Sequence, residues 1–197
     1  GAGLPIGIKL NSADFQKGGF TEEDSIATIE ALATLGIDLI EISGGTYESG
    51  VAKAPAKAST AAREAFFLDF AKKVRAKVKT PLMLTGGFRT FEGMNKALAS
   101  NDFDIVGIAR LMAIEPDAPK YLLNGSDSKQ TVHPIKTGVK KIDDLGVMEI
   151  LWYTLQLKRI ANGNEPKPNE NGLWAFIKSI LGSSWGTYAT KRTRAKS

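Results

Sequence analysis

The chain has 197 residues, 43% hydrophobic and 24% charged, which suits a soluble globular protein long enough to bury a core. It contains no cysteine, so disulfides and thiolate metal sites are excluded. The net charge is +5, but four basic residues near the C-terminus supply most of it, so we expect a solvated basic tail and no nucleic-acid partner. No apolar run approaches the roughly 18 residues that span a bilayer. The N-terminus lacks a signal-peptide pattern, so we expect a cytoplasmic protein without a membrane partner.

Short apolar runs alternate with amphipathic stretches from residue 5 to residue 125. The apolar runs predict strands near residues 5–10, 38–43, 81–85 and 104–109. Each is followed by a stretch with helical spacing, near residues 21–36, 60–78, 90–99 and 116–123. Thr21 with Asp24 three residues later has the pattern of a capping box, and Thr90 stands at the start of the third helix.

Four β–α units in a row indicate an α/β fold with a parallel sheet, and the strands are apolar throughout. An open doubly wound sheet and a (β/α)8 barrel of the TIM type both use this rhythm. The dinucleotide fingerprint and the P-loop motif are absent after every strand. Four units are too few to close an eight-stranded barrel, and the chain opens directly on a strand. We therefore expect a truncated barrel over residues 1–125, with its strands in sequential order.

The pattern changes after residue 125. Residues 126–163 read as a polar connection and a long closing helix, capped by Asp143 and ended by Gly163. Residues 164–197 read as a linker, an apolar C-terminal segment and the basic tail. The residues expected on the inner face of the long helix share its apolar spacing: Val147, Ile150, Leu151, Thr154, Leu155 and Ile160.

Functional groups in parallel β–α folds lie at the C-terminal ends of the strands. The third strand ends in Gly86, Gly87, Phe88 and Arg89, and the fourth ends in Ala109-Arg110. Glycine lets the backbone approach an anion closely, and arginine offers a forked donor to phosphate oxygens. Two such ends on adjacent strands favour a phosphate site, as formed in barrels after strands seven and eight. The alternative for each glycine pair is an ordinary turn.

Several segments resemble the Old Yellow Enzyme (NADH:flavin oxidoreductase) family, in the family's order and spacing. The resemblance runs from about residue 5 to residue 168. The matching segments are Ile8-Lys9-Leu10-Asn11-Ser12-Ala13-Asp14-Phe15, Arg63-Glu64-Ala65-Phe66-Phe67, Leu84-Thr85-Gly86-Gly87-Phe88-Arg89 and Val106-Gly107-Ile108-Ala109-Arg110 through Glu115-Pro116-Asp117. The resemblance implies that the four units are strands five to eight of the barrel, with C-terminal helices after them.

The resemblance also implies a flavin mononucleotide (FMN) site and a role for each matching residue. Lys9 stands where the family usually places an arginine beside the flavin pyrimidine. The positive charge is kept, but the forked donor geometry of a guanidinium is lost. Gly86, Gly87 and Phe88 match the phosphate segment after strand seven. Ala109 and Arg110 match a Gly-Arg pair after strand eight, and a backbone N–H survives the change to alanine. The intact family protein would use NADH or NADPH to reduce an enone-type small molecule through FMN.

The family's substrate-anchoring histidine pair and its proton-donating tyrosine belong to the N-terminal half of the barrel. His133, the one histidine here, lies in the polar connection, so we expect it to be solvated. Tyr47 follows the second strand and is either a mouth residue or a surface aromatic. We assign no catalytic residue and expect the chain to be inactive alone. The rival interpretations are another phosphate- or FMN-binding barrel and a non-catalytic half-barrel that self-associates into a homo-oligomer, since the N-terminal half-barrel is missing.

Overall fold

The computed structural model describes residues 3–14, 17–43, 60–88 and 90–193. The chain forms two compact units, and each is described by itself. The first unit holds residues 1–109 and 120–127, and the second holds residues 110–119 and 128–197. None of the described helices is long and apolar enough to cross a membrane.

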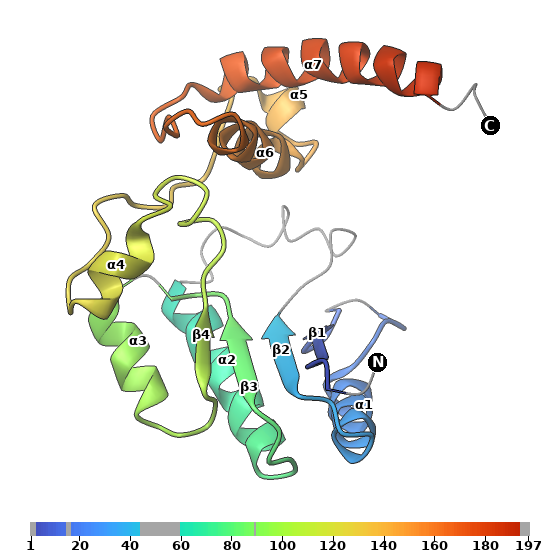
Figure 1. Cartoon of the computed structure of the whole chain (residues 1–197), viewed down its shortest axis with the longest axis vertical. Helices are drawn as coiled ribbons and strands as arrows, with labels where there is room; N and C mark the ends of the chain where they lie inside the picture. Colours follow the sequence, from blue (N-terminus) through green and yellow to red (C-terminus); the bar gives the residue numbers. More distant parts are fainter. Residues whose placement is uncertain (1–2, 15–16, 44–59, 89, 194–197) are drawn as a thin grey trace. The chain divides into compact units, whose positions relative to one another are not determined.

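The first unit is built on a parallel sheet of four strands (Figure 1). The strands are β1 (Gly7–Asn11), β2 (Leu39–Ser43), β3 (Leu82–Thr85) and β4 (Ile105–Gly107). Their order in the sheet is β1-β2-β3-β4, and every neighbouring pair is parallel. This confirms the sequential order that successive right-handed β–α units impose, and it excludes the reversed order of a doubly wound sheet.

A helix follows each strand: α1 (Glu22–Thr34), α2 (Thr60–Arg75), α3 (Phe91–Leu98) and the short α4 (Ala118–Leu123). The caps predicted for α1 and α3 are present. Asp24 N donates to Thr21 Oγ1 over 3.2 Å while Thr21 N donates to Asp24 Oδ2 over 3.1 Å, which completes the capping box. Gly93 N donates to Thr90 Oγ1 over 3.1 Å at the start of α3. Local capping chemistry therefore set the helix starts where the sequence predicted them.

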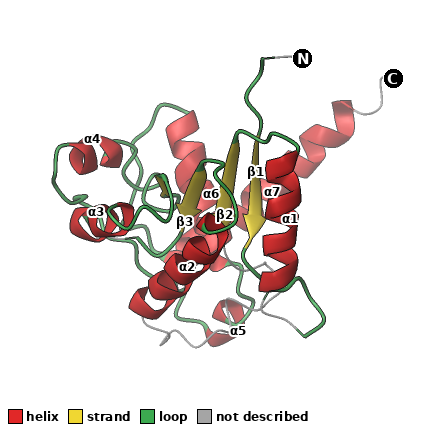
Figure 2. Ribbon diagram, turned by 90° about the horizontal axis from the view of Figure 1, so that it is seen from below, coloured by secondary structure: helices red, strands yellow, loops and turns green. Residues whose placement is uncertain are grey.

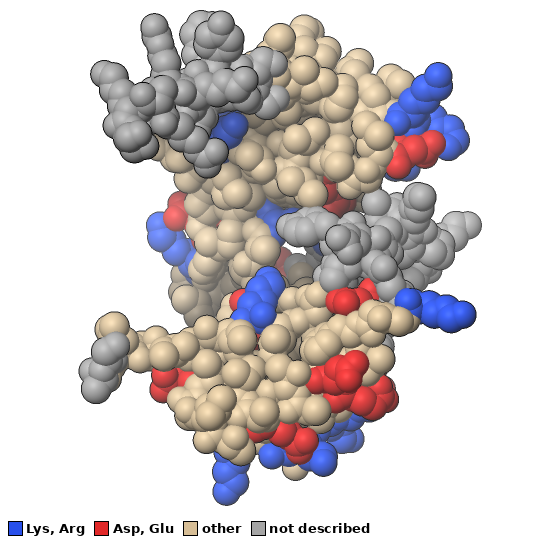
Figure 3. Space-filling model, turned by 90° about the vertical axis from the view of Figure 1, so that its right-hand side faces the viewer, with Lys and Arg blue, Asp and Glu red and all other residues tan. Residues whose placement is uncertain are grey.

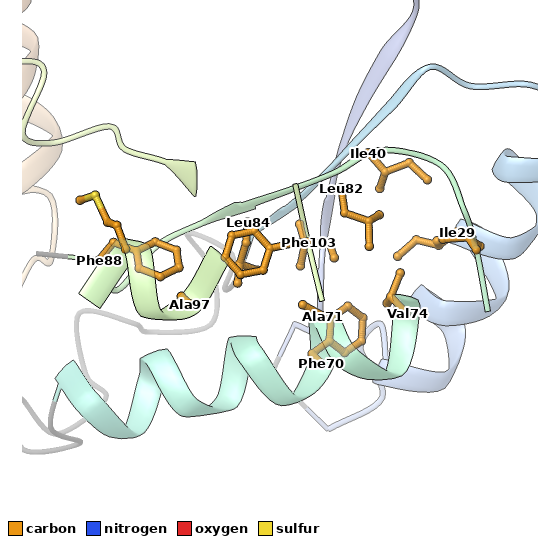
Figure 4. Close-up of a cluster of buried hydrophobic side chains, with 13 residues drawn as sticks. Ile29, Ile40, Phe70, Ala71, Val74, Leu82, Leu84, Phe88, Ala97 and Phe103 are labelled. Atoms are coloured by element: carbon orange, nitrogen blue, oxygen red, sulfur yellow. The ribbon is translucent and has the colours of Figure 1, made fainter. Parts of the chain in front are cut away.

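Helices α1, α2 and α3 contribute to one apolar core against one face of the sheet (Figures 2 and 4). Alternate residues of β2 and β3, Ile40, Ile42, Leu82 and Leu84, are at most 1% exposed and supply the sheet side of that core. The helix side is supplied by Ile29, Phe70, Ala71, Val74, Met94 and Ala97. Helices on a single face of a parallel sheet are the arrangement of a barrel wall, in which the opposite face points inward.

The opposite face of the sheet, called the inner face below, carries polar side chains. Register places Lys9 beside Glu41 and Glu41 beside Met83, in one row across the strands. The next row toward the strand ends pairs Asn11 with Ser43 and Thr85 with Gly107. The strands therefore alternate between an apolar outer residue and a polar or half-exposed inner one. The prediction from sequence missed this alternation because it treated each strand as one apolar run. Lys9 and Glu41 each stand between two aliphatic residues, so the runs looked continuous.

The second unit contains the helices α5 (Lys140–Asp143), α6 (Met148–Ala161) and α7 (Gly172–Thr193). The prediction that Asp143 caps the long helix is wrong: Asp143 ends α5, and the residue before α6 is Val147, which makes no side-chain cap. The Asp143 carboxylate instead accepts hydrogen bonds from Thr137 N and Thr137 Oγ1, both 2.7 Å long. These bonds lower the pKa of Asp143.

The buried face of α6 also differs from the prediction. Its buried residues are Met148, Trp152, Tyr153 and Gln156, whereas the predicted inner residues Val147 and Ile150 are 37% and 45% exposed. Gln156 explains the error, because a buried amide does not register in an apolar pattern. The predicted end of the helix is confirmed, since Gly163 adopts a φ of 72° and Gly163 N donates to Ile160 O over 2.9 Å.

The segment predicted as a linker between α6 and α7 is fastened to both helices through Glu170. Trp152 Nε1 donates to Glu170 O over 2.9 Å, and Gln156 Nε2 donates to its carboxylate over 2.9 Å. Lys178 of α7 forms an ion pair with the same carboxylate. Burial by itself would raise the pKa of Glu170, but the hydrogen bonds from Lys178 and Gln156 outweigh it and lower that pKa.

Candidate cofactor site

Predicted site residues of the first unit lie along the C-terminal edge of the sheet or just below it: Lys9, Gly86, Gly87 and Ala109. The last register pair between β3 and β4 is Thr85 with Gly107. Gly87 and Ala109 each stand two residues beyond that pair, on neighbouring strands. Lys9 lies in β1 on the inner face, two residues before the end of the strand.

The glycine pair after β3 requires glycine at both positions. Gly86 has a φ of 125° and Gly87 a φ of 85°, a backbone region that residues with a Cβ rarely adopt. Space is not the reason at Gly86, because an added Cβ would meet the Phe67 ring at an ordinary 3.7 Å. The chain therefore turns sharply at the strand end with no side chain over the peptide groups, as close approach to an anion demands.

Thr85 and Gly107 fit together just below this turn. A Cβ on Gly107 would lie 1.9 Å from Thr85 Oγ1 and 2.8 Å from Thr85 Cβ, so only glycine fits beside Thr85. Thr85 Oγ1 is buried and has no hydrogen-bond partner among the described residues. A buried hydroxyl without a partner costs free energy, about 1–3 kcal/mol. Thr85 is therefore a buried polar group packed against Gly107, directly before the glycine turn.

Phe88 contributes its side chain to the core rather than to the edge of the sheet. It is 8% exposed, and its ring centroid lies 6.0 Å from that of Phe103. Only the backbone of Phe88 can therefore serve the predicted phosphate segment. Arg89 and Tyr47 lie outside the described residues.

Lys9 is paired with a residue that sequence reasoning overlooked. Lys9 Nζ lies 3.0 Å from Glu41 Oε1, and the two side chains are 58% and 23% exposed. Their Cα atoms are register partners across β1 and β2. The signal was available in the sequence, because Glu41 is a carboxylate in the middle of an otherwise apolar strand, where glutamate is disfavoured.

The turn after β1 is held by a polar network. Ser12 N donates to Ser43 O over 2.7 Å, Ser25 Oγ donates to Asn11 O over 2.8 Å, and Asn11 Nδ2 donates to Asp14 Oδ1 over 3.3 Å. Ser12 is fully buried, and its Oγ finds no partner in the part of the chain that is described. The strand that carries Lys9 is thus fixed at its end by hydrogen bonds to α1 and β2.

Arg110 belongs to the second unit and is paired within it. Arg110 Nη1 donates to Glu149 Oε2 over 2.9 Å, with side chains 41% and 43% exposed. A guanidinium has five N–H donors, so this single bond leaves donors for an anion. The predicted convergence of the Gly87 and Arg110 N–H groups joins the two units and stays a prediction. His133 is exposed, as expected.

Two hollows of the described surface are lined by other residues. One is lined by residues of the α6–α7 loop and of α7, and the other by residues 30–34 and 77–80 of the first unit. Within the described ranges, no three His, Asp or Glu side chains are placed to hold a metal ion. Figure 3 shows basic and acidic side chains interspersed over the first unit, so no charge of one sign dominates that face.

The residues at the strand ends offer groups that suit an anionic ligand rather than a metal ion. Two glycines with positive φ provide the close approach, and Lys9 provides a cation on the inner face. Thr85 supplies a buried hydroxyl that lacks a partner among the described residues. The one carboxylate in the row, Glu41, is already neutralised by Lys9.

Comparison with known proteins places these observations in context. No family model matches the sequence. The chain is 40% identical over 129 residues to the NADH-dependent flavin oxidoreductase iliE of Neonectria sp. (strain DH2), covering 60% of this chain and 17% of that protein. It is 33% identical over 177 residues to the NADH-dependent flavin oxidoreductase iccE of Talaromyces variabilis, covering 81% of this chain and 43% of that protein. The chain thus spans less than half the length of these relatives.

A solved structure shares the fold. The complex of 2-naphthoyl-CoA reductase with 2-naphthoyl-CoA superposes with a TM-score of 0.52 and 28% sequence identity. The match covers 60% of this chain and 18% of the reductase chain. Part of this fold therefore recurs in a solved reductase, and the sequential parallel sheet with helices on one face is the arrangement of a TIM-type barrel wall.

Proposed function

We propose that the chain belongs to the NADH:flavin oxidoreductase (Old Yellow Enzyme) family, to which its similar relatives point, and that it carries the phosphate side and the pyrimidine contact of an FMN site. The observation that supports this most is the edge of the sheet. There, Gly86 and Gly87 turn with positive φ, Gly87 at the same register level as Ala109, while Lys9 presents a cation on the inner face.

Each residue has a defined task in this proposal. The N–H groups of Gly87 and of Ala109-Arg110 donate to the phosphate oxygens, and the Arg110 guanidinium adds a charge-assisted donor. The Lys9 ammonium donates to the pyrimidine edge of the flavin and stabilises negative charge there. When bound, FMN supplies hydride transfer from NADH or NADPH to an electron-poor alkene such as an enone. The relatives are named as NADH-dependent enzymes, which favours NADH as the reductant.

The proposal includes a partner for the open edges of the sheet. Both β1 and β4 are edge strands of the described sheet, and Ile6 and Ile105 beside them are 62% and 43% exposed. Exposed strand edges with apolar side chains favour association. An N-terminal half-barrel would pair with both edges and bring the histidine pair of the family, so the chain alone is inactive. Without that half, two copies pair edge to edge as a dimer.

Titration of the purified chain with FMN tests the assignment. The Lys9→Ala and Arg110→Ala variants are each expected to lower FMN affinity about tenfold or more, the value of one charge-assisted hydrogen bond. Lys96→Ala, which removes an exposed lysine of α3, is the matched control and leaves the affinity unchanged. If Arg110→Ala binds FMN as tightly as the unaltered chain, Arg110 is not a phosphate ligand. NADPH- or NADH-driven enone reduction by the chain alone would contradict the expected inactivity.

A further inference from the structure

The inner face of the sheet carries a charged pair that the proposed phosphate site does not use. Lys9 and Glu41 occupy the same register level of β1 and β2, with 3.0 Å between Lys9 Nζ and Glu41 Oε1. Within the described ranges, no other basic group forms an ion pair with Glu41. On its other side the register neighbour is Met83, an apolar side chain with no N–H or O–H donor. Among the described residues, the ion-pair partner of the Glu41 carboxylate is therefore Lys9.

This pair is not explained by stability. Ion pairs with partly exposed side chains contribute little to folding, since water competes for both partners. The Lys9 side chain is 58% exposed, and β1 is an edge strand. A four-carbon lysine stem on an edge strand has many rotamers, most of which would carry the ammonium away from the sheet. Glu41 is the more enclosed partner, 23% exposed, and it restricts that freedom.

We infer that Glu41 is a positioning residue that holds the Lys9 ammonium over the inner face, ready to meet the pyrimidine edge of a flavin. A lysine ammonium has three N–H donors, so the bond to Glu41 leaves two for the ligand. Because Glu41 already orders the Lys9 side chain, flavin binding does not have to supply the entropy cost of ordering it. The inference rests on the proposed function, because it assigns Glu41 a role through Lys9 in the same FMN site.

A double-mutant cycle tests the inference, with dissociation constants for oxidised and for reduced FMN as the readout. Lys9→Ala is expected to weaken binding about tenfold or more, with a larger loss for reduced FMN, which carries the negative charge. Glu41→Ala is expected to weaken binding at least about threefold, and the double variant Lys9→Ala with Glu41→Ala is expected to match Lys9→Ala alone. Glu41→Gln, which keeps an acceptor oxygen, is expected to recover part of the affinity.

Two controls separate positioning from folding. Glu30→Ala breaks a comparable Lys–Glu pair, with 3.4 Å between Lys77 Nζ and Glu30 Oε1, on α1 and away from the inner face. It should leave FMN affinity unchanged. Reductive methylation with ¹³C-formaldehyde gives an NMR signal for Lys9, assigned by its absence in Lys9→Arg. That signal should shift in Glu41→Ala without any flavin present.

The outcomes distinguish the inference from the function it rests on. If Lys9→Ala weakens binding but Glu41→Ala does not, or if the two losses add in the double variant, Glu41 does not act through Lys9. In that case the FMN site itself stands. If Lys9→Ala leaves FMN affinity unchanged, the flavin contact of Lys9 fails and the role of Glu41 fails with it. An unchanged Lys9 NMR signal in Glu41→Ala would also overturn the inference.

Discussion

Replacing Gly107 with alanine tests whether the sheet edge is packed as described. A Cβ at this position would lie 1.9 Å from Thr85 Oγ1 and 2.8 Å from both Thr85 Cβ and Met83 Cε. Rotation of the threonine can move Oγ1, and Met83 Cε is the end of a flexible side chain. Thr85 Cβ is fixed to the backbone of β3, so the strands must shift. Overpacking of this kind costs about 1–3 kcal/mol of the free energy of unfolding.

Urea unfolding followed by circular dichroism measures that loss. The matched control is Gly7→Ala on β1, where an added Cβ would meet Leu39 Cβ at 3.5 Å, an ordinary contact. Since alanine restricts the unfolded chain more than glycine does, the control should lose nothing and can gain about 0.5–1 kcal/mol. Two double variants locate the clash. Gly107→Ala with Thr85→Gly should be more stable than Gly107→Ala with Thr85→Ala, because only glycine at position 85 removes the Cβ that the new Cβ would meet. A Gly107→Ala variant no less stable than Gly7→Ala would refute the reasoning.

Four further predictions concern the two units and their edges. Phe70→Ala, at a side chain 1% exposed in the core, should destabilise the first unit by about 3–5 kcal/mol in urea unfolding. Trp152→Phe should cost about 1–3 kcal/mol, because Glu170 O loses its indole donor, and a loss below that range would show that water replaces the donor. The lowered pKa of Glu170 gives stability that is fully present above its unfolded pKa and is lost as the pH falls through its folded pKa, so Glu170→Gln should flatten the stability profile at low pH. Light scattering should give a mass about twice the 21.2 kDa of the chain, and a monomer would contradict edge pairing.

The fold could be predicted from the sequence because its signals are local and repeated. Strand positions, the sequential parallel order and the caps at Thr21 and Thr90 follow from apolar runs and from hydrogen bonds within four residues. The face of α6 could not be predicted, because the buried Gln156 is satisfied by Glu170 and Lys167, residues from beyond the helix. Asp143 was misassigned for a similar reason, since Thr137 competes for its carboxylate.

The candidate site was predictable only in part. The glycine turn after β3 follows from residue type, since both positions require positive φ. The pairing of Lys9 with Glu41 depends on the register of two strands 32 residues apart, which periodicity does not reveal. The sequence did not reveal that the Phe88 side chain is buried against Phe103, because Phe88 directly follows the two glycines of the predicted phosphate segment.

The most direct test of the FMN assignment is the ratio of riboflavin to FMN dissociation constants for the unaltered chain. The two ligands share the flavin ring and differ in the phosphate alone, so the ratio isolates the contribution of the strand ends. If Gly87, Ala109 and Arg110 bind phosphate, FMN should bind about tenfold or more tightly than riboflavin, and the difference should shrink with added salt. Equal affinities for the two flavins would contradict the phosphate site.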